Sequence, residues 1–200
     1  MLKFAHIADS HLGYLQFGKP ERVEDINRSF EEAITKAIEE KVDFILYPGD
    51  MFHESYPRIS AMRTAILNLM KLQEKGIKIF AIRGNHECTA RYGEGKSTNI
   101  LSLLNDVGLL KYLEKSYDML DNVKISGIGY FGKRTDAEIN NYFEKYSEGN
   151  YNILLLHGTL EGAIYNQEAE IKVNLSLIHI SDPTRPLYTS YAVFCLKQKK

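Results

Sequence analysis

The chain has 200 residues, of which 44% are hydrophobic and 26% are charged, and its formal net charge is −1. A chain of this length holds one domain with a sizeable core. The composition is that of a globular protein, and the near-neutral charge excludes a protein that binds nucleic acid through a global basic field. Any nucleic-acid partner would have to be held by local positive charge.

The cysteines and the apolar runs indicate the compartment. Cys88 and Cys195 form no C-x-x-C pair, so neither a disulfide framework nor a thiolate zinc site is indicated. The amino terminus reaches Asp9 without a long apolar segment, which argues against a signal peptide. No apolar run approaches the roughly 20 residues that span a bilayer. We therefore expect a cytoplasmic protein that does not engage a membrane.

Short apolar runs alternate with longer segments of helical period. The runs typical of strands are Lys3–Ala8, Asp43–Tyr47, Ile77–Ile82, Val123–Ile128 and Asn152–Leu156. The segments typical of helices are residues 23–40, 57–75, 98–106 and 136–146, and in the second we expect Ile59, Met62, Ile66 and Met70 to face inward. This alternation predicts an α/β fold with a mostly parallel sheet as its core and flanking helices.

The segment from residue 175 to 200 breaks this pattern. Its sequence, LSLIHISDPTRP followed by TSYAVFCLKQKK after two residues, has no amphipathic period and resembles the translation of a sequencing-library adapter. We expect residues 1–174 to form the domain and residues 175–200 to be a non-native tail, so that the natural chain continues differently after Asn174. The alternative is an ordinary carboxyl-terminal strand and turn.

Polar residues follow four of the expected strands directly. They are Asp9 and His11 after FAHIA, Asp50 after FILYPG, Asn85 and His86 after KIFAIRG, and His157 after NILLL. In a parallel α/β sheet, ligand sites gather in the crevice beyond the carboxyl ends of the strands. The four clusters are therefore predicted to converge.

These residue types suit a pair of metal ions. Asp, His and Asn offer the oxygen and nitrogen ligands that Mn²⁺, Fe or Zn²⁺ accept. A carboxylate such as that of Asp50 can bridge two cations ~3.5–4 Å apart, which activate a water and neutralise charge on a phosphoryl oxygen. Gly49 and Gly84 would let the backbone turn sharply before the ligands. Each residue alone fits a turn, a helix cap or a core histidine, and it is the joint pattern that favours metals.

The spaced motifs D-x-H, G-D, G-N-H-E and H-G resemble those of the calcineurin-like metallophosphoesterase superfamily. The fuller strings ADSHLGY, PGDMFHES, RGNHE and LLLHGT resemble, more narrowly, the SbcD-type nuclease subunit of the double-strand-break repair complex. The resemblance runs from residue 1 to about 174. It implies the sandwich fold of that superfamily, incomplete here at its carboxyl-terminal end.

The resemblance also implies roles for individual residues. Asp9 and His11 would bind the first metal, Asp50 would bridge, and Asn85 and His157 would bind the second. His86 would face the leaving group as a proton donor or electrostatic stabiliser, and His53 would touch the scissile phosphate. Family membership further implies two Mn²⁺ ions, exonuclease and endonuclease activity on DNA, a homodimer, and an SMC-like coiled-coil ATPase as partner. The helix at residues 57–75 is a candidate for the dimer contact.

One departure from the family matters for activity. The family supplies one further histidine to each metal from a late G-H-x-H motif, and this chain has no such motif. His179 lies in the expected tail without a second histidine, so we do not assign it as a ligand. Because each cation would lack one protein ligand, we expect this 200-residue chain to be inactive or nearly so.

Two other interpretations of the function stay open. A phosphatase or nucleotide phosphodiesterase could use the same fold, and a non-catalytic scaffold could have kept it. The strings GIGYFG and GEGKST imitate dinucleotide and phosphate loops but lack the flanking elements that those sites need. Near the second string, Arg91 and Lys96 could contact a phosphate backbone, as could Arg58 and Arg83.

Overall fold

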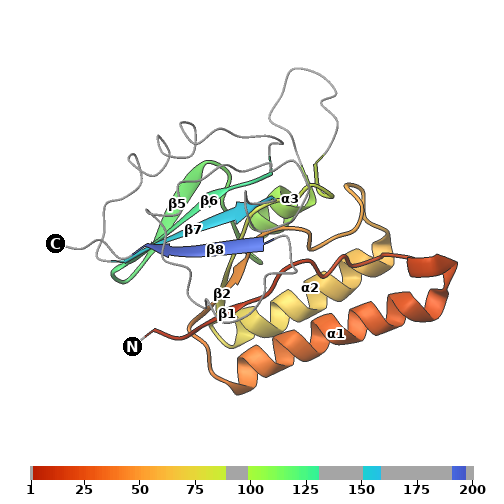
Figure 1. Ribbon diagram of the computed structural model, residues 1–200. Coiled ribbons are helices and arrows are strands. Elements are labelled where there is room, and N and C mark those ends of the chain that lie inside the picture. The colour runs from red at the N-terminus through yellow and green to blue at the C-terminus, as the bar shows by residue number, and fades with distance from the viewer. Residues whose placement is uncertain (1, 89–98, 131–150, 159–190, 197–200) are drawn as a thin grey trace, which may run out of the picture.

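Two four-stranded sheets form the centre of the protein (Figure 1), in a computed structural model that describes residues 2–88, 99–130 and 151–158, together with the backbone of 191–196. The first sheet has the order β1-β2-β3-β4 and is parallel throughout. Its strands are β1 (Phe4–His6), β2 (Phe44–Tyr47), β3 (Lys78–Ala81) and β4 (Lys111–Tyr112).

The second sheet has the order β5-β6-β7-β8 and is mixed. Its central pair, β6 and β7, is parallel, whereas both outer pairs are antiparallel. The strands are β5 (Ser116–Leu120), β6 (Val123–Ile128), β7 (Tyr151–His157) and β8 (Tyr191–Leu196). The helical elements are η1 (Gln16–Gly18), α1 (Pro20–Glu39), α2 (Ile59–Glu74) and α3 (Ile100–Asp106).

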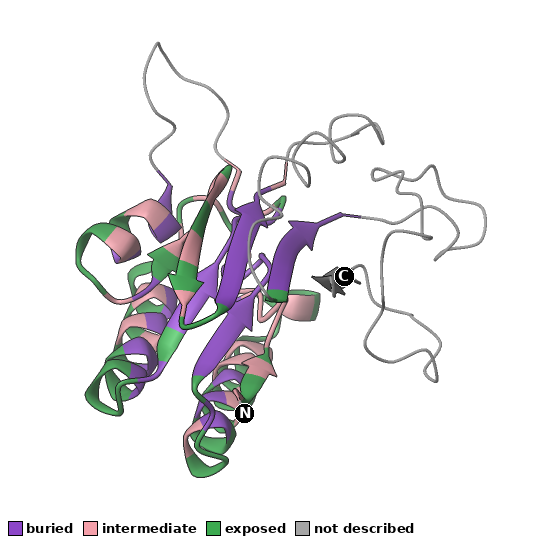
Figure 2. Cartoon of the chain, turned by 90° about the vertical axis from the view of Figure 1, so that its left-hand side faces the viewer, coloured by how far each residue is buried: buried purple, intermediate pink, exposed green. Residues whose placement is uncertain are grey.

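The two central strands of the first sheet, β2 and β3, are buried on both faces, because alternate side chains enter two different cores. Ile45, Tyr47 and Ile79 face the helices, where they meet buried residues of α1, α2 and α3. Phe44, Leu46 and Phe80 face the second sheet and pack against buried residues of β6 and β7. The layers are therefore helices, parallel sheet and mixed sheet, with the buried strands between the exposed outer surfaces (Figure 2).

The α/β class with a parallel sheet and flanking helices is confirmed, but one expectation about the sheet was wrong. His157 belongs to the second, mixed sheet and not to the parallel sheet that holds the other clusters. The apolar run at residues 152–156 would suit a buried strand of either sheet, so the sequence could not distinguish them. The antiparallel strand β5 was not predicted, because none of its residues is fully buried and its apolar signal is weak.

The orientation predicted for α2 was partly wrong. Ile59 and Met70 are exposed, whereas Met62 and Ile66 pack at the edge of the core. The buried face is formed by Ala61, Ala65, Asn68, Leu69 and Leu72. The small alanines let the helix approach its neighbours closely, and Leu69 and Leu72 are the large apolar residues of the buried face.

Two predictions concern segments that the structure describes only in part or not at all. The helix expected at residues 136–146 lies outside the described residues. Within the tail expected to be non-native, the backbone of β8 pairs antiparallel with β7, from Asn152 opposite Leu196 to His157 opposite Tyr191. The division at residue 174 stays a prediction. None of the helices in the described part of the chain combines the length and apolar composition that a bilayer crossing requires.

Candidate metal centre

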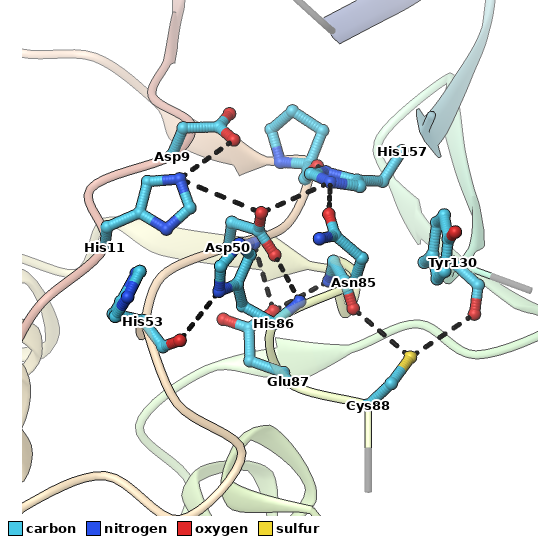
Figure 3. A network of polar contacts seen from close by, with 12 residues as sticks. Asp9, His11, Asp50, His53, Asn85, His86, Glu87, Cys88, Tyr130 and His157 are labelled. Atoms are coloured by element: carbon cyan, nitrogen blue, oxygen red, sulfur yellow. Dashed lines mark hydrogen bonds and ion pairs between the residues drawn. The ribbon is translucent and has the colours of Figure 1, made fainter. Parts of the chain in front are cut away.

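The predicted ligands meet where the carboxyl ends of β1, β2, β3 and β7 come together (Figure 3). The loops after β1 and β2 run side by side and are joined by backbone hydrogen bonds. Asp9 N donates to Gly49 O at 3.2 Å, and His11 N donates to Asp50 O at 3.1 Å. Leu12 and Phe52 then form an isolated parallel bridge, so both loops are extensions of the sheet.

Three of the predicted ligands have left-handed backbone conformations. The φ angles are +56° at Asp9, +44° at His11 and +51° at Asp50. This region costs an L-residue roughly 1–2 kcal/mol, although Asp and His tolerate it better than most. Strained backbone of this kind concentrates at functional sites, where the surrounding structure holds it in place.

Asp50 lies at the middle of the cluster, and its side chain is almost fully buried. Its Oδ2 atom is 3.8 Å from Nε2 of His11 and 3.5 Å from Nε2 of His157. Its other oxygen, Oδ1, accepts a hydrogen bond from the backbone N–H of His86 at 3.0 Å. One carboxylate therefore faces the first pair of predicted ligands on one side and the second pair on the other.

The imidazole of His157 is oriented by the backbone. Its Nδ1 atom donates to the carbonyl oxygen of Pro48 at 2.8 Å, which directs Nε2 into the site. Nε2 lies 2.9 Å from Oδ1 of Asn85. A carbonyl partner on the outer nitrogen fixes the ring orientation and tautomer of metal-binding histidines.

The charges of the site shift two pKa values in opposite directions. Burial raises the pKa of Asp50, but the hydrogen bond and charge of His157 together with the His86 amide outweigh it, so that the net shift is downward. Burial lowers the pKa of His157, but the hydrogen bond and charge of Asp50 bring it above its ordinary value. For His11, burial and the neighbouring histidines lower the pKa despite Asp50, which favours the neutral imidazole that metals bind.

His53 and His86 lie beside the first predicted ligands. Nδ1 of His86 is 2.7 Å from the carbonyl oxygen of His53, and the two rings are 4.7 Å apart between centroids. The His53 ring stacks on Tyr14 with a centroid distance of 4.0 Å. Burial and the charge of His86 lower the pKa of His53. Both histidines predicted to act on the phosphate are therefore next to the cluster and held in defined orientations.

Two glycines make room for the cluster, and they do so in different ways. Gly49 has a φ of +104°, and a side chain there would also collide with Nδ1 of His157. Gly84 does not have a positive φ, but a Cβ atom there would overlap the carboxylate of Asp50. The expected sharp turn is found at Gly49, whereas at Gly84 it is the missing side chain that matters.

Sequence reasoning missed three residues that support the site. Glu87 is fully buried and accepts hydrogen bonds from three backbone N–H groups of the neighbouring loops. The hydroxyl of Tyr47 donates to Ser10, the middle residue of the D-x-H motif. Glu87 was visible in the string RGNHE, but a glutamate in a loop carries no signal of burial.

The predicted phosphate contacts have different outcomes. Arg91 and Lys96 lie outside the described residues. Arg58 is exposed at the start of α2. Arg83 is nearly buried and forms an ion pair with Glu114 at 3.0 Å, so the suggestion that it contacts phosphate is not supported.

The donor set fits divalent cations. Asp9, His11 and Asp50 each offer a ligand atom, and these atoms all lie within 4.8 Å of one another. On the other side of Asp50, carboxylate, amide and imidazole ligand atoms converge from Asp50, Asn85 and His157. Oxygen and imidazole donors in this combination suit Mn²⁺, Fe or Zn²⁺.

Comparison with known proteins identifies the family. The calcineurin-like phosphoesterase family matches residues 2–180, which is most of the chain. The chain belongs to that family. The superfamily expected from the sequence is therefore confirmed, and the described residues include the group of Asp9, His11 and Asp50, which could hold a metal ion.

Curated relatives of this phosphoesterase are archaeal proteins named "DNA double-strand break repair protein Mre11". The protein from Methanococcus maripaludis is 37% identical over 161 residues, and that from Methanocaldococcus jannaschii is 33% identical over 167 residues. Each alignment covers 78% of this chain but 43% of the relative. The chain thus spans less than half the length of these relatives.

A solved structure agrees at the level of the fold. The crystal structure of TT1561 from Thermus thermophilus aligns with a TM-score of 0.51 and 11% sequence identity. The alignment covers 88% of this phosphoesterase and 76% of TT1561. Identity this low supports the architecture and carries no information on substrate.

Proposed function

We propose that this chain carries the catalytic domain of a two-metal DNA nuclease that acts in double-strand-break repair as an exonuclease and endonuclease. The observation that carries the proposal is the position of Asp50 Oδ2, which lies between Nε2 of His11 at 3.8 Å and Nε2 of His157 at 3.5 Å. A carboxylate in that position can be shared by two cations. The names of the archaeal relatives support DNA as the substrate.

The ligand roles follow the two sides of Asp50. Asp9 and His11 would hold one cation and Asn85 and His157 the other, with Mn²⁺ the ion that the family resemblance favours. Such a pair supplies an activated water near neutral pH and neutralises charge on the phosphoryl oxygens. The chain itself contributes the alignment, because backbone hydrogen bonds fix both loops and the His157 ring.

His53 and His86 would act on the phosphate. The Nδ1 atom of His86 is engaged by the carbonyl of His53, so Nε2 is the atom of the ring available to the substrate. We propose that His86 stabilises or protonates the leaving oxygen. His53, whose ring stacks on that of Tyr14, would contact the scissile phosphate. Outside the described residues, Arg91 and Lys96 are proposed to contact the DNA backbone.

Homodimer formation through α2 is part of the proposal. Its exposed Ile59, Leu67 and Met70 leave apolar surface on the side turned away from the core. Replacing Met70 by glutamate should shift the molecular mass measured by light scattering from dimer to monomer. An SMC-like ATPase partner rests on the family resemblance, and a cytoplasmic location rests on the cysteine usage. The assignment of residues 1–174 to the nuclease domain rests on the extent of the resemblance and on the break in pattern that follows it.

The test compares this 200-residue chain with the protein expressed from its complete reading frame. With Mn²⁺ and linear duplex DNA, we expect the complete protein to cleave and the 200-residue chain, which lacks a G-H-x-H motif, to be nearly inactive. Asp50→Asn in the complete protein should lower the rate by about 100-fold or more, because even residues that only support a ligand are worth ~10–100-fold. Equal rates for the two unmodified proteins would contradict the role given to the late histidines.

The same assay separates the alternatives. A phosphatase or nucleotide phosphodiesterase would hydrolyse a small phosphodiester such as bis-p-nitrophenyl phosphate and leave duplex DNA intact. A non-catalytic scaffold would hydrolyse neither and would bind no pair of Mn²⁺ ions in a calorimetric titration. The complete set of ligands before residue 158 argues against the scaffold.

A further inference from the structure

Glu87 joins two of the loops that carry the predicted ligands. Its Oε2 atom accepts hydrogen bonds from the backbone N–H of Asp50 at 3.0 Å and of Gly84 at 2.7 Å. Its Oε1 atom accepts from the N–H of Phe52 at 3.0 Å. Asp50 and Phe52 belong to the loop after β2, and Gly84 belongs to the loop after β3. One side chain therefore links the two loops at their backbones.

The three hydrogen bonds to Glu87 lie in the protein interior, where water cannot replace them. Glu87 is fully buried, and Phe52 and Gly84 are buried beside it. A buried backbone N–H without an acceptor is costly, so three such donors converging on one point require a partner with several lone pairs. A carboxylate has about four acceptor sites on two oxygens, and no neutral side chain offers as many.

The link also determines the conformation at Asp50. The backbone of this residue is left-handed, with a φ of +51°, and its N–H points to Glu87 while its Oδ1 accepts from His86 N–H. Without the acceptor, the N–H would favour a different peptide orientation, and the carboxylate would leave its place between His11 and His157. Asp50 is therefore fixed at its backbone by Glu87 and at its side chain by the His86 amide.

We propose that Glu87 is a positioning residue, which holds the Asp50 carboxylate between the two halves of the site by binding both loop backbones. This inference rests on the proposed function, because it assigns the Asp50 position a role in metal binding. Glu87 does not face the ligand atoms, since its two oxygens are occupied by backbone donors. Its effect on metal binding is therefore indirect.

The first experiment measures the link itself in the metal-free 200-residue chain. Amide hydrogen exchange of Asp50, Phe52 and Gly84 is compared between the unmodified chain and Glu87→Gln. The glutamine keeps the volume but replaces one acceptor oxygen by a donor, so one or more of these amides should exchange at least about 10-fold faster. Unchanged exchange at all three amides would overturn the proposal, whether or not the protein binds metal.

The second experiment measures Mn²⁺ binding by calorimetry and by the electron paramagnetic resonance signal of a coupled Mn²⁺ pair. It uses the 200-residue chain and the protein from the complete reading frame. We expect Glu87→Gln to weaken binding by about 10-fold and Glu87→Ala by about 100-fold, the range found for residues that support metal ligands. Glu87→Ala should also lose the coupled signal.

A control separates positioning from general loss of stability. Leu69→Ala removes buried volume from α2, outside the two loops that Glu87 joins, and should lower thermal stability without changing Mn²⁺ affinity or the coupled signal while the protein is folded. Equal Mn²⁺ binding by Glu87→Ala and the unmodified protein would overturn the proposal. Failure of the unmodified complete protein to bind Mn²⁺ would instead contradict the proposed function, and amide exchange would then decide the role of Glu87.

Discussion

The Nδ1 atom of His157 donates a hydrogen bond to the carbonyl oxygen of Pro48 at 2.8 Å, although 109 residues separate the two in sequence. The bond joins the end of β7 in the second sheet to the loop after β2 in the first. It also turns Nε2 of His157 toward Asp50, 3.5 Å away. The geometry of the site thus depends on how the two sheets pack against each other. The His157–Pro48 hydrogen bond is a direct contact between them.

The pH dependence of stability in the metal-free chain follows from His157 and Asp50. The raised pKa of His157 contributes stability that is fully present below its unfolded value of about 6.5 and is lost as the pH rises through the folded value. The lowered pKa of Asp50 contributes stability that is present above about pH 4 and is lost as the pH falls through the folded value. We therefore expect these two groups to stabilise the chain most between about pH 4 and 6.5.

Urea denaturation at a series of pH values measures this effect. His157→Gln should reduce the decline on the alkaline side of the window without abolishing it, because Glu87, whose pKa burial raises to about 7, still loses a proton there. Asp50→Asn should remove the decline on the acidic side that comes from this carboxyl. If His157→Gln keeps the same fall in stability from pH 6 to 8 as the unmodified chain, the pairing with Asp50 is not the cause.

Gly84→Ala tests the space beside Asp50. A Cβ atom at residue 84 would overlap the Asp50 carboxylate and come within 2.6 Å of the Asp50 backbone nitrogen. Such overpacking typically costs about 1–3 kcal/mol, and here it would also move the carboxylate. We expect a lower free energy of unfolding in urea and a loss of Mn²⁺ affinity of about 10-fold or more, as for other changes around metal ligands.

Gly76→Ala is the matched control for that substitution. Gly76 has a φ of +70° and open space around its Cβ position, so alanine there costs about 1 kcal/mol through the backbone alone. Mn²⁺ affinity should not change. A fall in affinity for both variants would mean that binding follows general stability and not the space at Gly84.

Tyr47→Phe tests the support of the D-x-H motif. The buried hydroxyl of Tyr47 donates to Ser10 between the two predicted ligands of that motif, and burial raises its pKa well above the ordinary range, so it stays a donor at every working pH. Loss of one such bond costs about 1 kcal/mol in the free energy of unfolding. The double variant with Ser10→Ala should lose no more than Tyr47→Phe alone, and fully additive losses in urea denaturation would exclude this pairing.

Sequence alone predicted that the candidate ligands would converge, because each of them lies at the end of a strand. Asp9, Asp50 and Asn85 each follow a short apolar run, and the parallel first sheet brings those ends to one edge. His157 was placed at the correct edge but in the wrong sheet, since an apolar run does not specify its neighbours. Strand pairing is a long-range property, so it was the least predictable part of the fold.

The supporting contacts of Glu87 and Tyr47 could not be predicted from the sequence, for a different reason. Glu87 and Tyr47 act through burial, and burial depends on how loops pack after the sheets have formed. Arg83 is a different case, because its place near the site loops suggested a possible phosphate contact. The structure instead turns it toward Glu114, which also accepts a hydrogen bond from Tyr112 at 2.8 Å.

Arg83→Met tests whether Arg83 serves the ion pair with Glu114 and not a phosphate contact. The Arg83–Glu114 pair is 3.0 Å long with Arg83 nearly buried, but the Glu114 side chain is 29% exposed and keeps the Tyr112 hydroxyl as a donor. We therefore expect a loss of roughly 1–3 kcal/mol, below the 3–5 kcal/mol typical of breaking a fully buried pair. Urea denaturation measures it, and a double-mutant cycle with Glu114→Gln isolates the coupling.

If Arg83 pairs with Glu114 and contacts no phosphate, the same variant should leave DNA binding unchanged. The dependence of DNA affinity on salt concentration should be unchanged in Arg83→Met, because a residue paired with Glu114 releases no counterion from the duplex. Arg58→Ala, at the exposed start of α2, is the comparison, and its slope should fall by about 1 if that residue contacts a phosphate. A smaller slope for Arg83→Met, with stability unchanged, would mean that the arginine leaves Glu114 to bind DNA.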